Sequence, residues 1–279
     1  MEAKEGSPVR HFRIRRVLNA HTESVVDSVA AEEPLEIRVR YWSKDAQVSD
    51  SLALTMRTPG HDRELAAGFL LSEGIVCRAE QILALHSLGM EPSNEIVAEL
   101  AKGVELEAWR LARSTFVNSA CGICGKRSRD ALAQELPENR NDVFRIGASV
   151  LEALPGRLRE RQHAFAETGG LHAAALIDSH GGFEMVFEDI GRHNALDKLL
   201  GWCVLNNRIP LSERLLLLSS RSSFELIQKA AMAGAPALAT VGGPSSLAIE
   251  AAREHGLTLV GFLRGGRFNI YSGEWRINS

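Results

Sequence analysis

The chain has 279 residues, of which 45% are hydrophobic and 24% charged, and its formal net charge is −3. This is an ordinary globular composition without the basic excess that nucleic-acid-binding domains usually carry. No segment approaches the ~18 apolar residues of a membrane-spanning helix, and the N-terminus has basic residues without the apolar region of a secretory signal, so we expect a cytoplasmic protein that binds neither nucleic acid nor membrane.

The first part of the chain is rich in predicted strands. Residues 1–30 show no clear periodicity, and we expect part of this segment to be extended. Residues 35–42 alternate apolar and polar side chains, which is the period of a half-buried strand. Residues 51–56 have the composition of a neighbouring strand. Asp62 is a suitable N-cap for a helix that runs to Gly74. Further short strands are expected at 82–88, 95–100 and 104–109.

A polar, glycine-bearing segment, 118–130, shows neither alternation nor a helical stripe, and we interpret it as a loop between a strand-rich part, 1–117, and an α/β part, 131–279. In the second part, helices alternate with short apolar strands, as in a layered sheet with helices on both faces. The expected helices span 148–162, with Pro155 breaking it or starting its second half, 193–205, 223–234 and 245–256. The expected strands span 171–177, 183–188, 214–220, 236–241 and 257–263.

The strongest local signal for chemistry is the pair Cys121 and Cys124 in the sequence Cys-Gly-Ile-Cys-Gly. A structural zinc site needs two more ligands, and no second such pair follows. A thioredoxin-like dithiol belongs near the start of a chain, and a zinc deaminase needs a His-x-Glu element, in which Ala174 stands here for the Glu. Persulfide transfer fits better, because Lys126 and Arg127 stabilise a thiolate and the second cysteine supplies a resolving thiol. A purely structural pair is the alternative.

The isolated cysteines Cys77 and Cys203 are expected to be small core residues. Two polar clusters follow buried strands. In 188–198 a strand ends, a glycine turns and a helix begins, which is where α/β sheets bind anions; a capped helix with a solvated first turn is the alternative. In 262–267 two arginines flank two glycines beside an aromatic ring, which suits a phosphate and a base; an ordinary turn with solvated arginines is the alternative.

These motifs together resemble the formate dehydrogenase accessory proteins of the FdhD type. The resemblance rests on six blocks that occur in the family's order. Any one of the blocks is weak, but six in order are specific. The blocks are 56–74, 121–125, 168–176, 188–198, 220–234 and 257–271.

The resemblance implies a sulfur carrier, a sulfurtransferase, that takes sulfur from a cysteine desulfurase as a persulfide on Cys121, with Cys124 as its partner. It implies that the sulfur passes to the molybdenum bis-guanine-dinucleotide cofactor, bound as a substrate, for a formate dehydrogenase apoenzyme. It also implies a homodimer and a cytidine-deaminase-like sheet without a metal site. A cofactor-binding chaperone without a persulfide step is the alternative. The segment implied to bind the guanine dinucleotide, with GDP as a surrogate ligand, is Phe262, Leu263, Arg264, Gly265, Gly266 and Arg267.

Two departures from the family pattern concern this pocket and leave the cysteines untouched. Ser220 stands where the resemblance leads us to expect a glycine before Arg221. The turn 241–244, Val-Gly-Gly-Pro, replaces a Ser-Ala-Pro-like turn.

Overall fold

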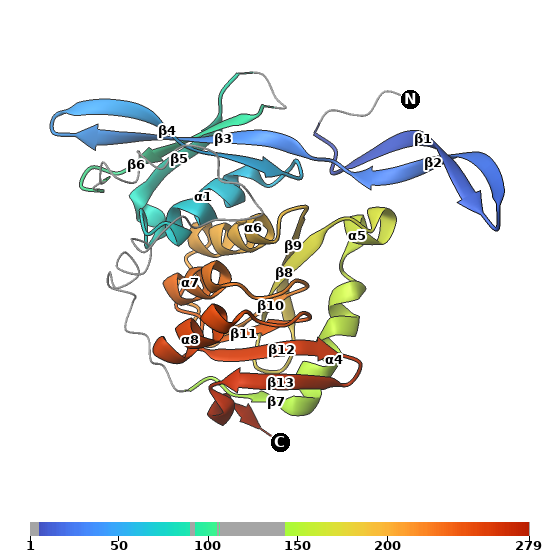
Figure 1. The fold of residues 1–279 in the computed structure, drawn as a ribbon. Coiled ribbons are helices and arrows are strands. Elements are labelled where there is room, and N and C mark those ends of the chain that lie inside the picture. The colour runs from blue at the N-terminus through green and yellow to red at the C-terminus, as the bar shows by residue number, and fades with distance from the viewer. Residues whose placement is uncertain (1–5, 90–92, 105, 107–142, 279) are drawn as a thin grey trace.

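The computed structural model describes residues 6–89, 93–104, 106 and 143–278. It contains a four-stranded sheet, a six-stranded sheet and helices packed between and around them (Figure 1). The expected mixed α/β architecture is confirmed, whereas the likeness of the larger sheet to cytidine deaminases stays a prediction. The loop at 118–130, which the sequence suggests as a boundary, lies outside the described residues.

The four-stranded sheet follows the alternation seen in the sequence. Its strands are β3 (Glu33–Ser43), β4 (Ala46–Arg57), β5 (Ile82–Ser87) and β6 (Glu95–Leu100), in the order β4-β3-β6-β5. Alternate side chains of β3 are buried because one face of the strand packs on the core. The strand predictions in this part are confirmed up to residue 100, and most of the strand expected at 104–109 lies outside the described residues.

Helix α1 (Asp62–Ser72) occurs where it was expected, but its predicted N-cap is wrong. The N-cap residue is His61, in a left-handed conformation, and no side chain caps it. The Asp62 carboxylate instead accepts two hydrogen bonds of 2.9 Å from the Arg57 guanidinium. Arg57 is only 2% exposed, and a buried charge is costly unless it is paired, so this demand outweighs the local capping preference.

The six-stranded sheet has the order β13-β12-β11-β10-β8-β9. Strands β10, β11 and β12 are parallel, and the other three strands are antiparallel to their neighbours. All residues of β10 and β11 are buried, as expected for a strand covered on both faces. The five strands expected here are confirmed, and β13 is an addition. Their bounds are β8 His172–Ile177, β9 Phe183–Asp189, β10 Leu215–Leu218, β11 Ala237–Thr240, β12 Thr258–Arg264 and β13 Arg267–Ser272.

Helices cover both faces of this sheet. Helices α6 (Arg192–Leu205), α7 (Phe224–Met232) and α8 (Ser246–Glu254) share one hydrophobic cluster with one face, and α4 (Ala148–Arg159) packs on the other. Helix α4 runs on through Pro155, because its buried leucines hold it against the sheet. The remaining short elements are α5 (His163–Thr168), the 3₁₀ turns Ala79–Gln81 and Glu274–Arg276, and the paired β7 (Ile146–Gly147) and β14 (Ile277–Asn278). Among the described residues, none of the helices has the length and apolarity to span a bilayer.

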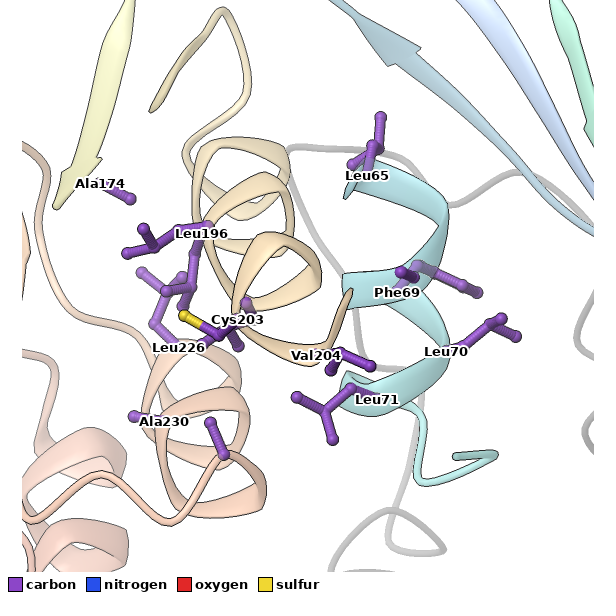
Figure 2. Close-up of a cluster of buried hydrophobic side chains, with 14 of the residues drawn as sticks. Leu65, Phe69, Leu70, Leu71, Ala174, Leu196, Cys203, Val204, Leu226 and Ala230 are labelled. Atoms are coloured by element: carbon purple, nitrogen blue, oxygen red, sulfur yellow. The ribbon is translucent and has the colours of Figure 1, made fainter. Parts of the chain in front are cut away.

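A close contact between α1 and α6 joins the two sheets into one core. A Cβ added to Gly201 would lie 1.7 Å from the carbonyl oxygen of Glu64 and 2.6 Å from the amide nitrogen of Gly68, so the two helix backbones touch at a pair of glycines. Figure 2 shows part of the core around these helices, with apolar side chains from α1, α6, α7 and β8. Cys203 lies among them and is fully buried, which confirms its prediction as a core residue.

Two further features concern the N-terminal segment, which is extended as expected, and Cys77, which differs from expectation. Residues Val9–Leu18 and His21–Ala30 form a two-stranded antiparallel ribbon, β1–β2, that projects from the body (Figure 1), although the sequence showed no periodicity there. The reason is that the ribbon has no covered face to impose an alternation. The core assignment of Cys77 is wrong, since Cys77 is exposed and its amide and thiol both donate to the side-chain oxygen of Gln81.

Candidate functional site

The polar motifs of the second half meet at one edge of the six-stranded sheet. Strands β10, β11 and β12 are parallel, so the loops that follow them lie at the same edge, as do the N-termini of α7 and α8. Strand β8 is antiparallel to β10, so His172, at the start of β8, lies at this edge too. His172 is paired with Asp189, the last residue of β9, which precedes α6. We call this region the carboxyl edge. It is where open α/β sheets usually bind ligands.

The segment 262–267 forms the end of β12, a tight turn and the start of β13. Gly265 and Gly266 have φ values of 60° and 69°, the left-handed conformations that a two-residue hairpin turn requires. Arg264 and Arg267 stand opposite each other in the β12–β13 register, and both are exposed. Leu263 is buried. The predicted cofactor segment is therefore an exposed hairpin tip that presents two guanidinium groups, with Leu263 anchoring it in the core.

The ring of Phe262 packs on the neighbouring loop of the carboxyl edge. Phe262 has a φ of 53°, its amide donates to the Gly242 carbonyl at 2.9 Å, and a Cβ added to Gly243 would lie 2.5 Å from the ring. A Cβ added to Gly242 would in turn lie 2.7 Å from the side chain of Arg221. Gly242 and Gly243 lie in the turn that differs from the family pattern, and their lack of side chains makes room for Phe262 and Arg221. Ser220, the other difference from the family pattern, is buried, and its carbonyl accepts a hydrogen bond from the Gly242 amide at 3.0 Å.

Positive charge gathers around His172. Burial lowers the pKa of this half-buried histidine, and Arg192, His193 and Arg221 lower it further, against the opposing effect of Asp189. His172 is therefore neutral at neutral pH, and Arg192 and Arg221 both lie near enough to act on it. These two arginines come from α6 and from the β10–α7 loop, 29 positions apart in the chain. Sequence reasoning missed His172 and Arg221 as site residues, although both lie in blocks that carry the family resemblance.

His193 is held at the carboxyl edge by α7. Its Nε2 lies 2.9 Å from a carboxylate oxygen of Glu225 and 3.5 Å from the hydroxyl of Ser223. Glu225 stands in the first turn of α7, where a carboxylate is favoured by the helix dipole. The contact between the His193 ring and the Glu225 carboxylate therefore holds the start of α6 against the start of α7.

The other polar residues of 188–198 turn inward and form a buried network. Lys198 Nζ lies 2.7 Å from Asp189 and donates to the Thr58 carbonyl at 2.8 Å. The amides of Thr58 and Gly191 donate to Asp189, and Asn194 donates to the Met56 carbonyl at 2.7 Å. This block is therefore neither a solvated helix cap nor wholly a binding surface. Arg192 and His193 lie at the carboxyl edge, while Asp189, Asn194 and Lys198 fasten the start of α6 to the end of β4.

The two predicted catalytic residues, Cys121 and Cys124, lie outside the described residues. Within the described ranges, no three His, Cys, Asp or Glu side chains gather as a metal ion would require. A pocket of about 420 Å³ lies at the opposite edge, where β10 begins, between Arg208 and Arg214. Both arginines share one carboxylate partner, Glu184, and none of the predicted site residues lines this pocket.

Comparison with known proteins places these features in context. A model of the FdhD/NarQ family matches residues 30–278. The chain is 44% identical over 280 residues to a sulfur carrier protein FdhD of Streptomyces avermitilis, covering 98% of this chain and 96% of that one. It is 43% identical over 282 residues to the protein of the same name from Mycobacterium tuberculosis, covering 98% and 99%. A crystal structure from Desulfotalea psychrophila, described as a formate dehydrogenase accessory protein, shares the fold with a TM-score of 0.73 at 21% identity, covering 97% and 99%.

Proposed function

Since the chain belongs to the FdhD/NarQ family, we propose that it is a sulfur carrier that serves the maturation of a formate dehydrogenase. The observation that carries this proposal is the identity of 43–44% along nearly the whole chain to proteins named sulfur carrier proteins. The Cys-Gly-Ile-Cys sequence, followed by Lys126 and Arg127, supports it, because neighbouring cations favour the thiolate that sulfur exchange requires.

The proposed reaction has two steps. The Cys121 thiolate attacks the outer sulfur of a cysteine desulfurase persulfide, and the desulfurase cysteine leaves as a thiolate, so that the chain gains one sulfur atom. The Cys124 thiolate then attacks the Cys121 sulfur and releases hydrosulfide to the molybdenum bis-guanine-dinucleotide cofactor, the substrate. The sulfane sulfur is reduced to sulfide as the two cysteines are oxidised to a disulfide, which a cellular dithiol reduces.

The hairpin 262–267 is proposed to hold the guanine dinucleotide. An exposed aromatic ring and two exposed guanidinium groups are a suitable set for a base and a phosphate. GDP is the surrogate ligand. Replacing Arg264 or Arg267 with alanine should weaken GDP binding in a calorimetric titration, and unchanged affinity in both variants would remove the hairpin from the site.

The sulfur step is tested by intact-protein mass spectrometry after reaction with a cysteine desulfurase and cysteine. Wild-type protein should gain one sulfur atom that a thiol reductant removes, and Cys121→Ala should not. Cys124→Ala should still gain the sulfur but should not release it as hydrosulfide. If no variant gains sulfur and Cys121→Ala still matures its client, the protein is a non-covalent cofactor chaperone.

A second copy of the chain is the proposed partner for the β1–β2 ribbon. Phe12, Val17, Leu18 and Val26 are exposed on it by 51–66%, and an isolated two-stranded ribbon is marginally stable in water. Covering these side chains in a homodimer would remove the apolar exposure. Sedimentation velocity should therefore show a dimer that Phe12→Asp dissociates, and a wild-type monomer would contradict the proposal.

A further inference from the structure

The pocket of about 420 Å³ at the edge opposite the carboxyl edge has no part in the proposed sulfur reaction. Its volume lies within the range of about 300–1,000 Å³ that is usual for small-molecule sites. The lining comes from the end of β8 and from the connection between α6 and β10. Leu176, Pro210 and Leu211 supply the apolar part of this lining. The pocket is therefore separate from the hairpin 262–267 and from the residues around His172.

Two arginines that line this pocket share a single carboxylate. Glu184 of β9 pairs with Arg208 through one oxygen and with Arg214 through the other. The guanidinium carbon of Arg208 also lies 5.1 Å from the centre of the Trp202 ring, which helps to fix its orientation. Two positive charges on one negative charge leave an excess of one, and each guanidinium keeps N–H donors that Glu184 does not occupy. The pocket thus offers oriented donors and a positive charge to a ligand carboxylate.

An acidic residue lines the same pocket. Glu213 is exposed, and its carboxylate has no ion pair with any residue that the structure describes. It precedes Arg214 in the chain, and Nη1 of Arg214 donates to the Glu213 backbone carbonyl at 3.1 Å. The excess positive charge and the unpaired negative charge of the lining therefore come from neighbouring residues. A ligand with a single charge would pair with only one of them, whereas a ligand with both a carboxylate and an ammonium group would pair with both.

We propose that this pocket binds a free α-amino acid with an apolar side chain. Its carboxylate accepts hydrogen bonds from Arg208 and Arg214, its ammonium group faces Glu213, and its side chain packs on the apolar part of the lining. A peptide terminus carries only one of the two charges, so the lining favours the free amino acid. The inference is independent of the proposed sulfur reaction.

Three probes with the same apolar group test the two charges separately. L-Leucine has both charged groups, isocaproate lacks the ammonium group and isoamylamine lacks the carboxylate. Binding of each probe to the full-length protein is measured by calorimetric titration. L-Leucine should bind more tightly than either analogue by at least about tenfold, because each analogue leaves one charge of the lining without its partner.

Variants of the lining identify the residues that hold each group. Arg214→Gln and Arg208→Gln should each weaken L-leucine and isocaproate by at least about tenfold, because each removes the excess positive charge. Glu213→Gln should weaken L-leucine, whereas isocaproate should bind no more weakly than to wild type. Glu152→Gln, which removes an exposed carboxylate on α4, is the matched control and should change no affinity. Thermal unfolding of each variant checks that the fold is intact.

Three results would overturn the proposal. The first is that wild-type protein binds none of L-leucine, L-valine and L-methionine at millimolar concentrations. The second is that isocaproate binds as tightly as L-leucine, which would indicate a site for simple carboxylates. The third is that L-leucine binds both arginine variants as tightly as wild type, which would place its site elsewhere in the protein. The gain of sulfur on Cys121 enters none of these measurements, so the sulfur-carrier proposal and the amino-acid site can fail separately.

Discussion

Replacing Gly201 with alanine should force helices α1 and α6 apart. The new Cβ would lie 1.7 Å from the Glu64 carbonyl oxygen and 2.6 Å from the Gly68 amide nitrogen. Cβ atoms essentially never approach other atoms within 3.0 Å, so the backbones must move by at least 3.0 − 1.7 = 1.3 Å. A helical carbonyl cannot rotate away as a flexible side chain can, because its own helix holds it.

The energetic cost follows from the packing around this contact. A gap of 0.5–1 Å already forfeits about a quarter to a half of a dispersion contact, and ordinary overpacking costs about 1–3 kcal/mol. Since this substitution opens the interface that joins the two sheets, we expect a loss of about 3–5 kcal/mol. At about 2 °C for each kcal/mol in a chain of this size, the midpoint of thermal unfolding should fall by about 6–10 °C.

Gly156→Ala is the matched control. Gly156 lies inside α4, is exposed and would have nothing within 4 Å of its new Cβ. The same substitution should therefore stabilise the protein by about 0.5–1 kcal/mol, because alanine loses less backbone entropy on folding. Both variants are compared with wild type by calorimetry or circular dichroism. A Gly201→Ala protein that unfolds within about 2 °C of wild type would refute the close contact between the helices.

Three further predictions concern buried and titrating groups. Lys198→Met leaves Asp189 buried and unpaired and should cost about 3–5 kcal/mol in chemical unfolding, whereas adding Asp189→Asn should recover part of that loss; additive effects would count against the pair. The pKa of His172, measured by NMR, should lie below 6.5 and rise in Arg192→Gln, because burial and that arginine both lower it. Protonation of His172 is thus less favourable in the folded state, so its contribution to stability is present above pH 6.5 and is lost as the pH falls; a pKa above 6.5 would reverse this sign. Burial raises the pKa of Cys203 to about 12, whereas Cys77 is exposed. In a Cys121→Ser/Cys124→Ser protein, iodoacetamide should therefore modify Cys77 in the native state and Cys203 only after denaturation. Labelling of both cysteines in the native protein would disprove the burial of Cys203.

The local hydrophobic pattern was sufficient to predict a strand or helix wherever the packing around that element buries the same faces along its whole length. Strand β3 alternates because one face is buried, and β10 and β11 are continuously apolar because both faces are. The prediction of Ser245 as the cap of α8 is confirmed, since its hydroxyl accepts from the Ala248 amide at 3.2 Å. The family, and with it the pair Cys121 and Cys124 as the proposed sulfur relay, also comes from the order of motifs along the chain.

Local pattern failed where a distant residue made the stronger demand. Asp62 has the residue type of a helix cap, but the buried guanidinium of Arg57 claims its carboxylate. Strands β1 and β2 form a ribbon in which they pair with each other and pack little elsewhere, so no alternation of apolar and polar residues marks them. In each case the deciding interaction depends on which groups are buried, and burial is a property of the folded chain.

The sequence by itself determined the alternation of strands and helices, the family and the residues proposed for sulfur chemistry, because each is written in neighbouring positions. Only the tertiary structure decided which polar residues act together. The antiparallel entry of β8 brings His172 to the same edge as Arg192 and Arg221, and the order of the parallel strands sets Phe262 on the loop beside them. The buried pair of Lys198 and Asp189 was hidden in the same motif as Arg192, since periodicity does not distinguish a charge that turns inward from one that meets a ligand.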